Sequence, residues 1–233
     1  MNGDNLGSRL WALIVKPGLA MEWVRERPQW LVAAVILFVV ISLFTAATTH
    51  IAGPEQMELM RDTRFGQMMS EEDWEHDYQE ALSPSPTKRL INGLTGGFGV
   101  CIVIFFYGLF FLLFSKLAGG TGSFKQIMGV NFWASIIPYV LGTLVKLPLI
   151  FAKQTVVGVS IGLAALTPNA DLMSATYQAL MYFGDFFSWW GIVVLIIGFE
   201  KVNEFSRGKA ATVVILPWLL LTGVLFGLGR LFV

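Results

Sequence analysis

Long apolar stretches alternate with polar linkers along the 233-residue chain. A helix that rises 1.5 Å per residue needs roughly 20 apolar residues to cross a hydrocarbon core of ~30 Å. Stretches of this length take up more than half of the chain and predict an all-α, polytopic membrane bundle of five transmembrane helices. They cover Gln29–Thr49, Ile91–Phe114, Ile127–Phe151, Leu180–Phe199 and Ala210–Phe232.

The segment before the first span, Ser8–Trp30, predicts two short helices that are broken at Pro17 and ended by Pro28. Its apolar run Leu10–Val15 is too short for the core of a cleavable signal, and a small-residue cleavage site does not follow it. Apolar faces surrounded by lysine and arginine favour an N-terminal helix that lies at the membrane interface. The alternative is a cytoplasmic lead-in that packs on the bundle.

The linker Ala52–Arg89 is strongly polar, with nine acidic residues against four basic ones. Pro54 predicts the start of a first helix, because proline suits the first helical position. Ser70 followed by Asp73 predicts a capping box at the start of a second helix, which should run to about Leu82. Methionine and aromatic residues give both helices an apolar side, so we expect them on the outer surface of the bundle.

A second outer linker, Ala152–Ala179, contains an apolar segment that is too short to span. This segment, Thr155–Leu166, is either an outward extension of the third helix or a shallow re-entrant turn that ends at Pro168-Asn169.

The distribution of lysine and arginine predicts the topology, because cytoplasmic loops carry the excess of these residues. The short linkers on the same side of the membrane as the N-terminus are rich in lysine and arginine, whereas the longer linkers on the opposite side are not. With five spans, the expectation is a cytoplasmic N-terminus, an extracytoplasmic C-terminus and one membrane domain over residues 1–233. The inside set is Arg9, Lys16, Arg25, Arg27, Lys116, Lys125, Lys201, Arg207 and Lys209, and the outside set is Arg61, Arg64, Lys88, Arg89 and Lys153, with Arg230 near the C-terminus.

Composition agrees with this architecture and excludes several classes of protein. Hydrophobic residues make up 55% and charged residues 14% of the chain, which leaves no room for a separate soluble domain of ordinary size. The net charge of zero argues against nucleic acid as a partner. One cysteine, Cys101, provides no disulfide framework.

Catalytic and metal-binding patterns are weak. Glu72, His76 and Glu80 share one face of a predicted helix, and zinc could bind such a set, but a solvated acidic helix explains the same residues better. The glycine-rich Gly119–Gly122 lacks the strand and lysine of a phosphate loop and predicts a tight turn. No catalytic, cofactor-binding or metal residue is assigned, and we expect a protein that is not an enzyme and has no cofactor.

Polar residues inside the spans are the candidate functional residues, because charge in lipid is costly. They are Asn131, Lys146 and Asp185, joined by Pro138 in the third span, where prolines should bend the helix. Either Lys146 and Asp185 form a pair across the outer half of the bundle, or Lys146 reaches the interface and Asp185 caps the fourth helix.

Glycines four residues apart indicate where helices approach each other closely. Such pairs occur at Gly93 and Gly97 in the second span and at Gly223 and Gly227 in the fifth.

Several motifs resemble bacterial members of the YIP (Ypt/Rab-interacting protein) superfamily. They are Ser123–Pro138, which contains Ser-Phe-Lys-Gln-Ile-Met-Gly-Val-Asn-Phe-Trp-Ala-Ser-Ile-Ile-Pro; Asp185–Gly191, which reads Asp-Phe-Phe-Ser-Trp-Trp-Gly; Gly198–Ala210; and the early Lys16-Pro17 with its pre-span helix. The resemblance implies a non-enzymatic membrane protein with five spans in a bacterial inner membrane. Eukaryotic members engage small GTPases, but their longer N-terminal region and Asp-Leu-Tyr-Gly-Pro-type motif are missing here, so that role does not transfer.

Two functional hypotheses follow. The first is a membrane-organising or adaptor protein that self-associates or binds other membrane proteins, with Arg207, Lys209 and the N-terminal helix contacting partners or anionic lipid head groups. The second is a small transporter or lipid-handling protein whose path passes Asn131, Lys146 and Asp185. Sparse polarity inside the spans favours the first.

Overall fold

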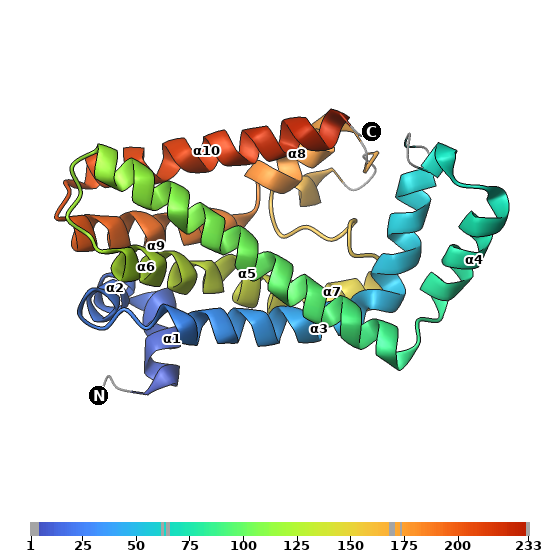
Figure 1. The fold of residues 1–233 in the computed structure, drawn as a ribbon, viewed down its shortest axis with the longest axis horizontal. Coiled ribbons are helices and arrows are strands. Elements are labelled where there is room, and N and C mark those ends of the chain that lie inside the picture. The colour runs from blue at the N-terminus through green and yellow to red at the C-terminus, as the bar shows by residue number, and fades with distance from the viewer. Residues whose placement is uncertain (1–4, 62, 64–65, 168–170, 173, 232–233) are drawn as a thin grey trace. The chain divides into compact units, whose positions relative to one another are not determined.

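The computed structural model describes residues 5–61, 63, 66–167, 171–172 and 174–231. Its helices are α1 Leu6–Val15, α2 Pro17–Glu26, α3 Trp30–Arg61, α4 Glu71–Leu82, α5 Pro86–Leu117, α6 Phe124–Ile136, α7 Thr143–Lys153, α8 Ala175–Phe183, α9 Phe186–Asn203 and α10 Arg207–Leu231 (Figure 1). A π-helical turn, Ile137–Gly142, joins α6 to α7, and short 3-10 turns cover Gly66–Met68 and Leu163–Leu166. Among these residues the only β-type pairing is one isolated bridge between Gly162 and Asp185.

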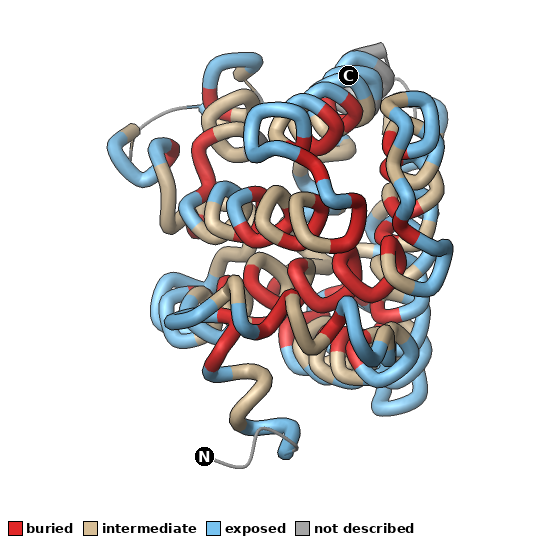
Figure 2. The backbone as a smooth tube through the Cα atoms, turned by 90° about the vertical axis from the view of Figure 1, so that its left-hand side faces the viewer, coloured by how far each residue is buried: buried red, intermediate tan, exposed pale blue. Residues whose placement is uncertain are grey.

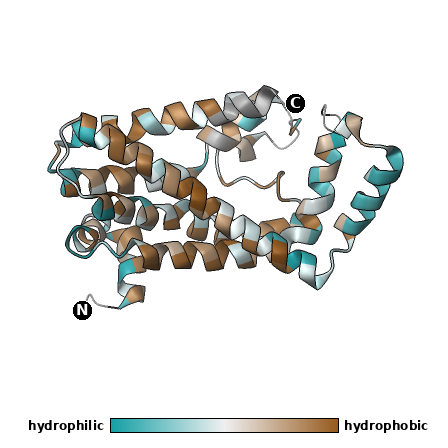
Figure 3. Ribbon diagram, in the orientation of Figure 1, coloured by the Kyte–Doolittle hydropathy of each residue, from teal (hydrophilic) through white to brown (hydrophobic). Residues whose placement is uncertain are grey.

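Five helices in the described part of the chain are long and apolar enough to cross a membrane, which confirms the expected all-α membrane architecture. They cover Trp30–Arg61, Pro86–Leu117, Phe124–Lys153, Phe186–Asn203 and Arg207–Val224. Apolar residues dominate these helices, whereas α4 is largely hydrophilic (Figure 3). Large apolar side chains such as Leu31 and Phe98 stay exposed on them, at 61% and 62%, as expected for surfaces that face lipid.

The fourth spanning helix begins later than expected. The sequence predicts a span from Leu180, but α8 ends at Phe183 with Gly184 as its C-cap, and α9 begins at Phe186. Gly184 contains no Cβ, and one added there would lie 2.8 Å from the Cβ of Leu163. The helix therefore breaks where another backbone segment approaches it.

The chain divides into two compact units, which we describe separately. The first comprises residues 1–38, 99–141 and 187–221. Its core surrounds α6, in which nine of thirteen residues are buried, Trp133 and Phe132 among them. Gly198 lets α6 and α2 pack closely against α9, because a Cβ at this position would lie 2.9 Å from the sulfur of Met21. Figure 2 shows buried and exposed positions alternating along the helices, as expected when each helix buries one side.

The N-terminal segment folds as the sequence predicts. Two short helices, α1 and α2, meet at Lys16, and Pro17 occupies the first turn of α2. The second helix ends at Glu26, before Pro28. The alternative of a segment packed on the bundle also has support, since Ala20, Met21 and Val24 are buried.

The second unit comprises residues 39–98, 142–186 and 222–233. In it the prediction of a new helix at Pro54 is wrong: α3 continues through Pro54 to Arg61. A proline inside a helix removes one backbone hydrogen bond, so α3 continues here with one hydrogen bond fewer. The Cβ of Ala81 on α4 lies 3.2 Å from the position of a Cβ on Gly53. The predicted helix start at Ser70 is confirmed, because its side chain accepts a hydrogen bond from the N–H of Asp73. The Asp73 carboxylate accepts from the Ser70 hydroxyl at 2.6 Å.

The apolar segment Thr155–Leu166 is not an extension of the third helix. Helix α7 ends at Lys153, and Gln154 adopts a left-handed conformation with φ of 52°. The following residues form turns and the short 3-10 turn at Leu163–Leu166. Of the expected end of this segment, Pro168 and Asn169 lie outside the described residues, as do Arg64 and the side chain of Arg230.

Candidate functional site

The structure brings Lys146 and Asp185 together. The Lys146 Nζ lies 2.9 Å from the Asp185 Oδ2, and the side chains are 27% and 11% exposed. Lys146 comes from α7, and Asp185 lies between α8 and α9. Of the two alternatives drawn from the sequence, the structure has the one in which Lys146 and Asp185 form an ion pair.

Backbone contacts hold Asp185 in position. Gly162 pairs with Asp185 in the isolated bridge, and the N–H of Leu163 donates to the carbonyl of Gly184 at 3.1 Å. The segment after α7 is therefore hydrogen-bonded to the break between α8 and α9. A charge pair held in this way can bind a polar ligand or act as a structural tie between helices.

Asn131 and Pro138 belong to the first unit rather than to the unit of the ion pair. The Nδ2 of Asn131 donates to the carbonyl oxygen of Ile104 at 2.6 Å, and the side chain is 2% exposed. Pro138 lies in the π-helical turn, where its Cδ would be 3.1 Å from a Cβ on Gly191. Asn131 thus ties α6 to α5, and Pro138 packs against α9.

A carboxylate on α3 organises the segment after α7, and the sequence did not reveal it. Glu55 Oε2 accepts hydrogen bonds from the N–H groups of Val156 and Val157 at 2.7 and 3.1 Å. The hydroxyl of Thr155 donates to Glu55 Oε1. Glu55 lies about one hundred residues away in the chain, so no local pattern could indicate the contact.

Helix α8 holds the same segment from another side. The hydroxyl of Tyr177 donates to the carbonyl oxygen of Val157 at 3.2 Å. Burial, together with the negative charge of Glu55, raises the pKa of Tyr177 above its ordinary value of 10.0. The phenol therefore stays protonated at neutral pH and keeps its donor.

Two polar contacts fix α2 to the spanning helices of the first unit. The Lys201 Nζ on α9 lies 2.8 Å from Glu22 Oε2 on α2. The side-chain amide of Gln126 on α6 donates to the carbonyl of Arg25 at 3.0 Å. The hydrogen bond from Lys201 lowers the pKa of the Glu22 carboxyl below its ordinary value of 4.5. The α1–α2 pair is therefore an anchored part of this unit.

A buried asparagine organises the turn between α5 and α6. Asn203 Oδ1 accepts from the hydroxyl of Ser115 at 2.6 Å and from the N–H of Gly122 at 3.0 Å. The turn contains Gly119 with φ of +76°. The glycine run thus forms the tight turn that the sequence predicts, held by a residue the sequence did not single out.

The linker between α9 and α10 contributes the two predicted contact residues. Arg207 is 78% exposed, and its Nε lies 3.2 Å from Glu200 Oε2. Lys209 places its Nζ 4.5 Å from the ring centroid of Phe205. Both cations remain at the surface.

The acidic helix α4 binds to the end of α3 through its own side chains. The Tyr78 hydroxyl donates to Glu58 at 2.8 Å, and the Arg61 guanidinium lies 4.4 Å from the Trp74 ring centroid. His76 Nδ1 lies 3.3 Å from Asp77. Among the described residues, no group of three or more His, Cys, Asp or Glu side chains could hold a metal ion.

The five apolar helices define a polytopic helical membrane protein. The chain belongs to the Yip1 domain family, whose model matches residues 11–228. This confirms the resemblance noted from the sequence.

A curated relative supports the assignment. The membrane protein YknW of Bacillus subtilis (strain 168) is 24% identical to this chain over 200 residues, which cover 85% of this chain and 80% of the relative. No solved structure matches the chain significantly.

Proposed function

We propose that this Yip1-domain protein is a non-enzymatic organiser of a bacterial inner membrane that assembles with itself or with other membrane proteins. One observation carries the proposal: the α1–α2 pair is anchored by its inner face and exposes apolar side chains on its outer face. Glu22 and Lys201 form the anchor, at 2.8 Å. The exposed set is Leu6, Trp11, Ile14, Val15 and Leu19.

An exposed apolar face beside basic residues suits insertion into the head-group region of a bilayer. Trp11 is 60% exposed, as expected for a side chain that meets lipid or a partner and not the core of the same chain. With a cytoplasmic N-terminus and an extracytoplasmic C-terminus, these helices would lie on the cytoplasmic leaflet, together with Arg207 and Lys209.

A fluorophore at residue 11 tests this placement. The variant Trp11→Cys in a Cys101→Ser background is labelled and reconstituted into liposomes with lipids brominated near the head group. We expect strong quenching, and we expect Glu22→Lys to reduce it because two like charges would then face each other. The swap Glu22→Lys with Lys201→Glu should restore it.

A label that stays unquenched in inserted protein would contradict the membrane-surface role.

Energy transfer between differently labelled copies, measured at falling protein-to-lipid ratios, tests assembly. We expect transfer to persist beyond the level of random collisions. Reporter fusions after Val233 and within 52–89 should report the outer compartment, and one at Gly120 the cytoplasm.

A transporter or lipid-handling role is the second candidate, and the Lys146–Asp185 pair supports it. A charged pair in a spanning bundle often marks a path for a substrate or ion. The backbone bridge at Gly162 and the hydrogen bond of Asn131 to Ile104 are the contacts of a structural tie, which ranks this role second.

A further inference from the structure

Two arginines line an open hollow where the chain enters its first spanning helix. The hollow has a volume of about 270 Å³ and is lined by Leu6, Arg9, Arg27, Gln29 and Val32. These residues come from α1, the link after α2 and the first turn of α3. The hollow therefore combines two cations, an amide and two apolar side chains.

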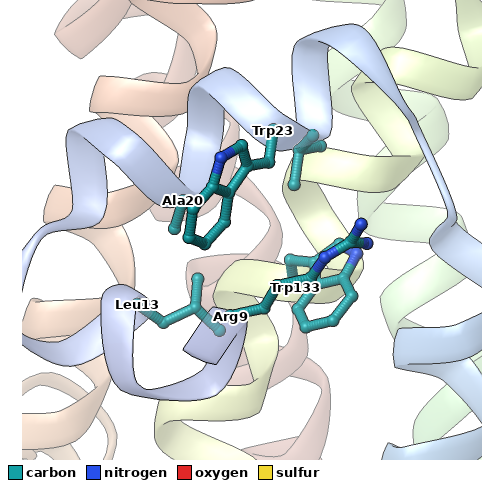
Figure 4. Close-up of a pocket in the computed structure, with 6 residues that line it drawn as sticks. Arg9, Leu13, Ala20, Trp23 and Trp133 are labelled. Atoms are coloured by element: carbon teal, nitrogen blue, oxygen red, sulfur yellow. The ribbon is translucent and has the colours of Figure 1, made fainter. Parts of the chain in front are cut away.

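Neighbouring side chains hold the guanidinium of Arg9. Its Nη1 donates to the Gln29 side-chain oxygen at 2.7 Å. Its Nε is buried and has no hydrogen-bond partner in the part of the chain that the structure describes. On its inner side Arg9 lines a small cavity with Leu13, Ala20, Trp23, Val24 and Trp133 (Figure 4). Arg9 thus forms part of the wall of the hollow, and its guanidinium carries more N–H donors than the one that Gln29 uses.

The hollow has a polar and an apolar end. Val32 is 40% exposed in the first turn of α3, and Leu31 and Val35 beside it are each 61% exposed. These apolar side chains continue along a helix that is long enough to span a membrane. A ligand that fits both kinds of lining carries a negatively charged head group and a hydrocarbon chain in one molecule.

We propose that this hollow binds the phosphodiester group of an anionic phospholipid. Arg9 and Arg27 contact the phosphate oxygens, since the planar guanidinium matches phosphate geometry. Leu6 and Val32 contact the upper part of an acyl chain. The proposal rests on the proposed function, because it needs α1 and α2 at the membrane surface.

Titration of the purified full chain with dioleoyl phosphatidylglycerol and dioleoyl phosphatidylcholine, followed by native mass spectrometry, tests the site. We expect preferential binding of phosphatidylglycerol. Each of Arg9→Gln and Arg27→Gln should weaken that binding about fivefold, the effect typical of one basic residue near an anionic surface. Lys125→Gln is the control and should leave the preference nearly unchanged, because Lys125 is an exposed cation that does not line the hollow.

A second variant separates a shaped site from diffuse attraction. Val32→Trp fills the hollow and keeps every charge, so it should also weaken phosphatidylglycerol binding. Unchanged binding in Val32→Trp, or equal losses in Lys125→Gln and Arg9→Gln, would overturn the proposal. Displacement of the lipid by inorganic phosphate at millimolar concentration would assign the hollow to a soluble anion and overturn it as well.

The label at residue 11 distinguishes failure of this site from failure of the proposed function. A label that lipid quenches, combined with a phosphatidylglycerol preference that survives Arg9→Gln and Val32→Trp, removes the site alone. A label that lipid does not quench removes the membrane-surface role itself.

Discussion

The ammonium group of Lys146 lies 2.9 Å from a carboxylate oxygen of Asp185 and connects α7 to the break between α8 and α9. Asp185 is 11% exposed, so its charge is largely removed from solvent. In such surroundings each charge depends on the other, because an unpaired charge in a spanning bundle is costly. We therefore expect the pair to stabilise the fold whether or not a ligand also uses it.

We expect a double-mutant cycle to detect this dependence. Lys146→Met and Asp185→Asn should each destabilise the protein. The loss should be smaller than the ~3–5 kcal/mol typical of a fully buried pair, because Lys146 is 27% exposed. The double variant should recover part of the loss, with a coupling of roughly 0.5–3 kcal/mol. Unfolding in mixed micelles with a denaturing detergent measures all four free energies.

Mild and additive effects would contradict the expected energetic dependence between Lys146 and Asp185. They would also argue against this pair as the centre of a transport path. Strong coupling would leave both functional roles open, since a tie and a ligand site depend equally on the pair.

Glu55 gives a prediction for the segment after α7. Glu55→Ala removes a carboxylate that accepts from the N–H groups of Val156 and Val157. Hydrogen bonds to a charged group contribute roughly 1.5–3 kcal/mol each. We expect hydrogen exchange at these two amides to accelerate at least tenfold, with smaller changes elsewhere.

Glu58→Ala is the matched control for Glu55→Ala, because Glu58 lies on the same helix and accepts from Tyr78. It should accelerate exchange in α4 and leave Val156 and Val157 protected. Equal acceleration of those amides in both variants would show that the effect is general loosening of α3.

Sequence reasoning predicted the elements whose signals are local. Apolar length predicts the spans, Pro17 separates α1 from α2, and Ser70 caps α4. Each depends on residues within one or two helical turns. The prediction at Pro54 is wrong because a proline can begin a helix or lie within one, and the residues next to it do not distinguish the two.

Contacts between distant parts of the chain limited the prediction of the site. Lys146 and Asp185 were identified because charged residues in apolar spans are rare. Glu55 and Asn203 were not, because an acid in an acidic loop and an amide at a helix end look ordinary. Their importance comes from the N–H groups of Val156 and Gly122, which belong to distant segments.

The two glycine pairs differ in the structure, and this gives a matched test. A Cβ on Gly93 would lie 2.6 Å from the carbonyl oxygen of Ser42 and 3.0 Å from the Cβ of Ala46, both on α3. Among the residues that the structure describes, a Cβ on Gly223 or Gly227 meets nothing within 4 Å. Close approach within the described part of the chain is therefore found at Gly93 and not at Gly223 or Gly227.

We expect Gly93→Ala to destabilise the protein by about 1–3 kcal/mol, because the helix backbones must separate. Gly223→Ala should be neutral or stabilising by up to about 1 kcal/mol, the helix-propensity difference between the two residues. Thermal unfolding in detergent compares them. Equal losses would mean that Gly223 packs against another copy of the chain.

The pH dependence of the α1–α2 anchor follows from Glu22. The hydrogen bond from Lys201 lowers the Glu22 pKa below 4.5, burial opposes this, and Arg25 adds to it. A carboxyl with a lowered pKa in the folded state stabilises that state fully above about pH 4.5, and the contribution disappears as the pH falls through the folded-state pKa. Both side chains are about one-third exposed, at 29% and 33%, so the effect should stay below about 1 kcal/mol.

We therefore expect a spin label at residue 11 to be immobile at neutral pH and to become more mobile as the medium is acidified below 4.5, the ordinary pKa of Glu22. Glu22→Gln should show the higher mobility already at pH 7 and lose most of the pH response, because the group that titrates is gone. Arg25→Gln is the control: it leaves the Lys201 contact in place and should retain the transition, moved slightly toward higher pH. A transition that persists unchanged in Glu22→Gln would assign the pH response to other carboxylates and remove this ion pair as the anchor of the N-terminal helices.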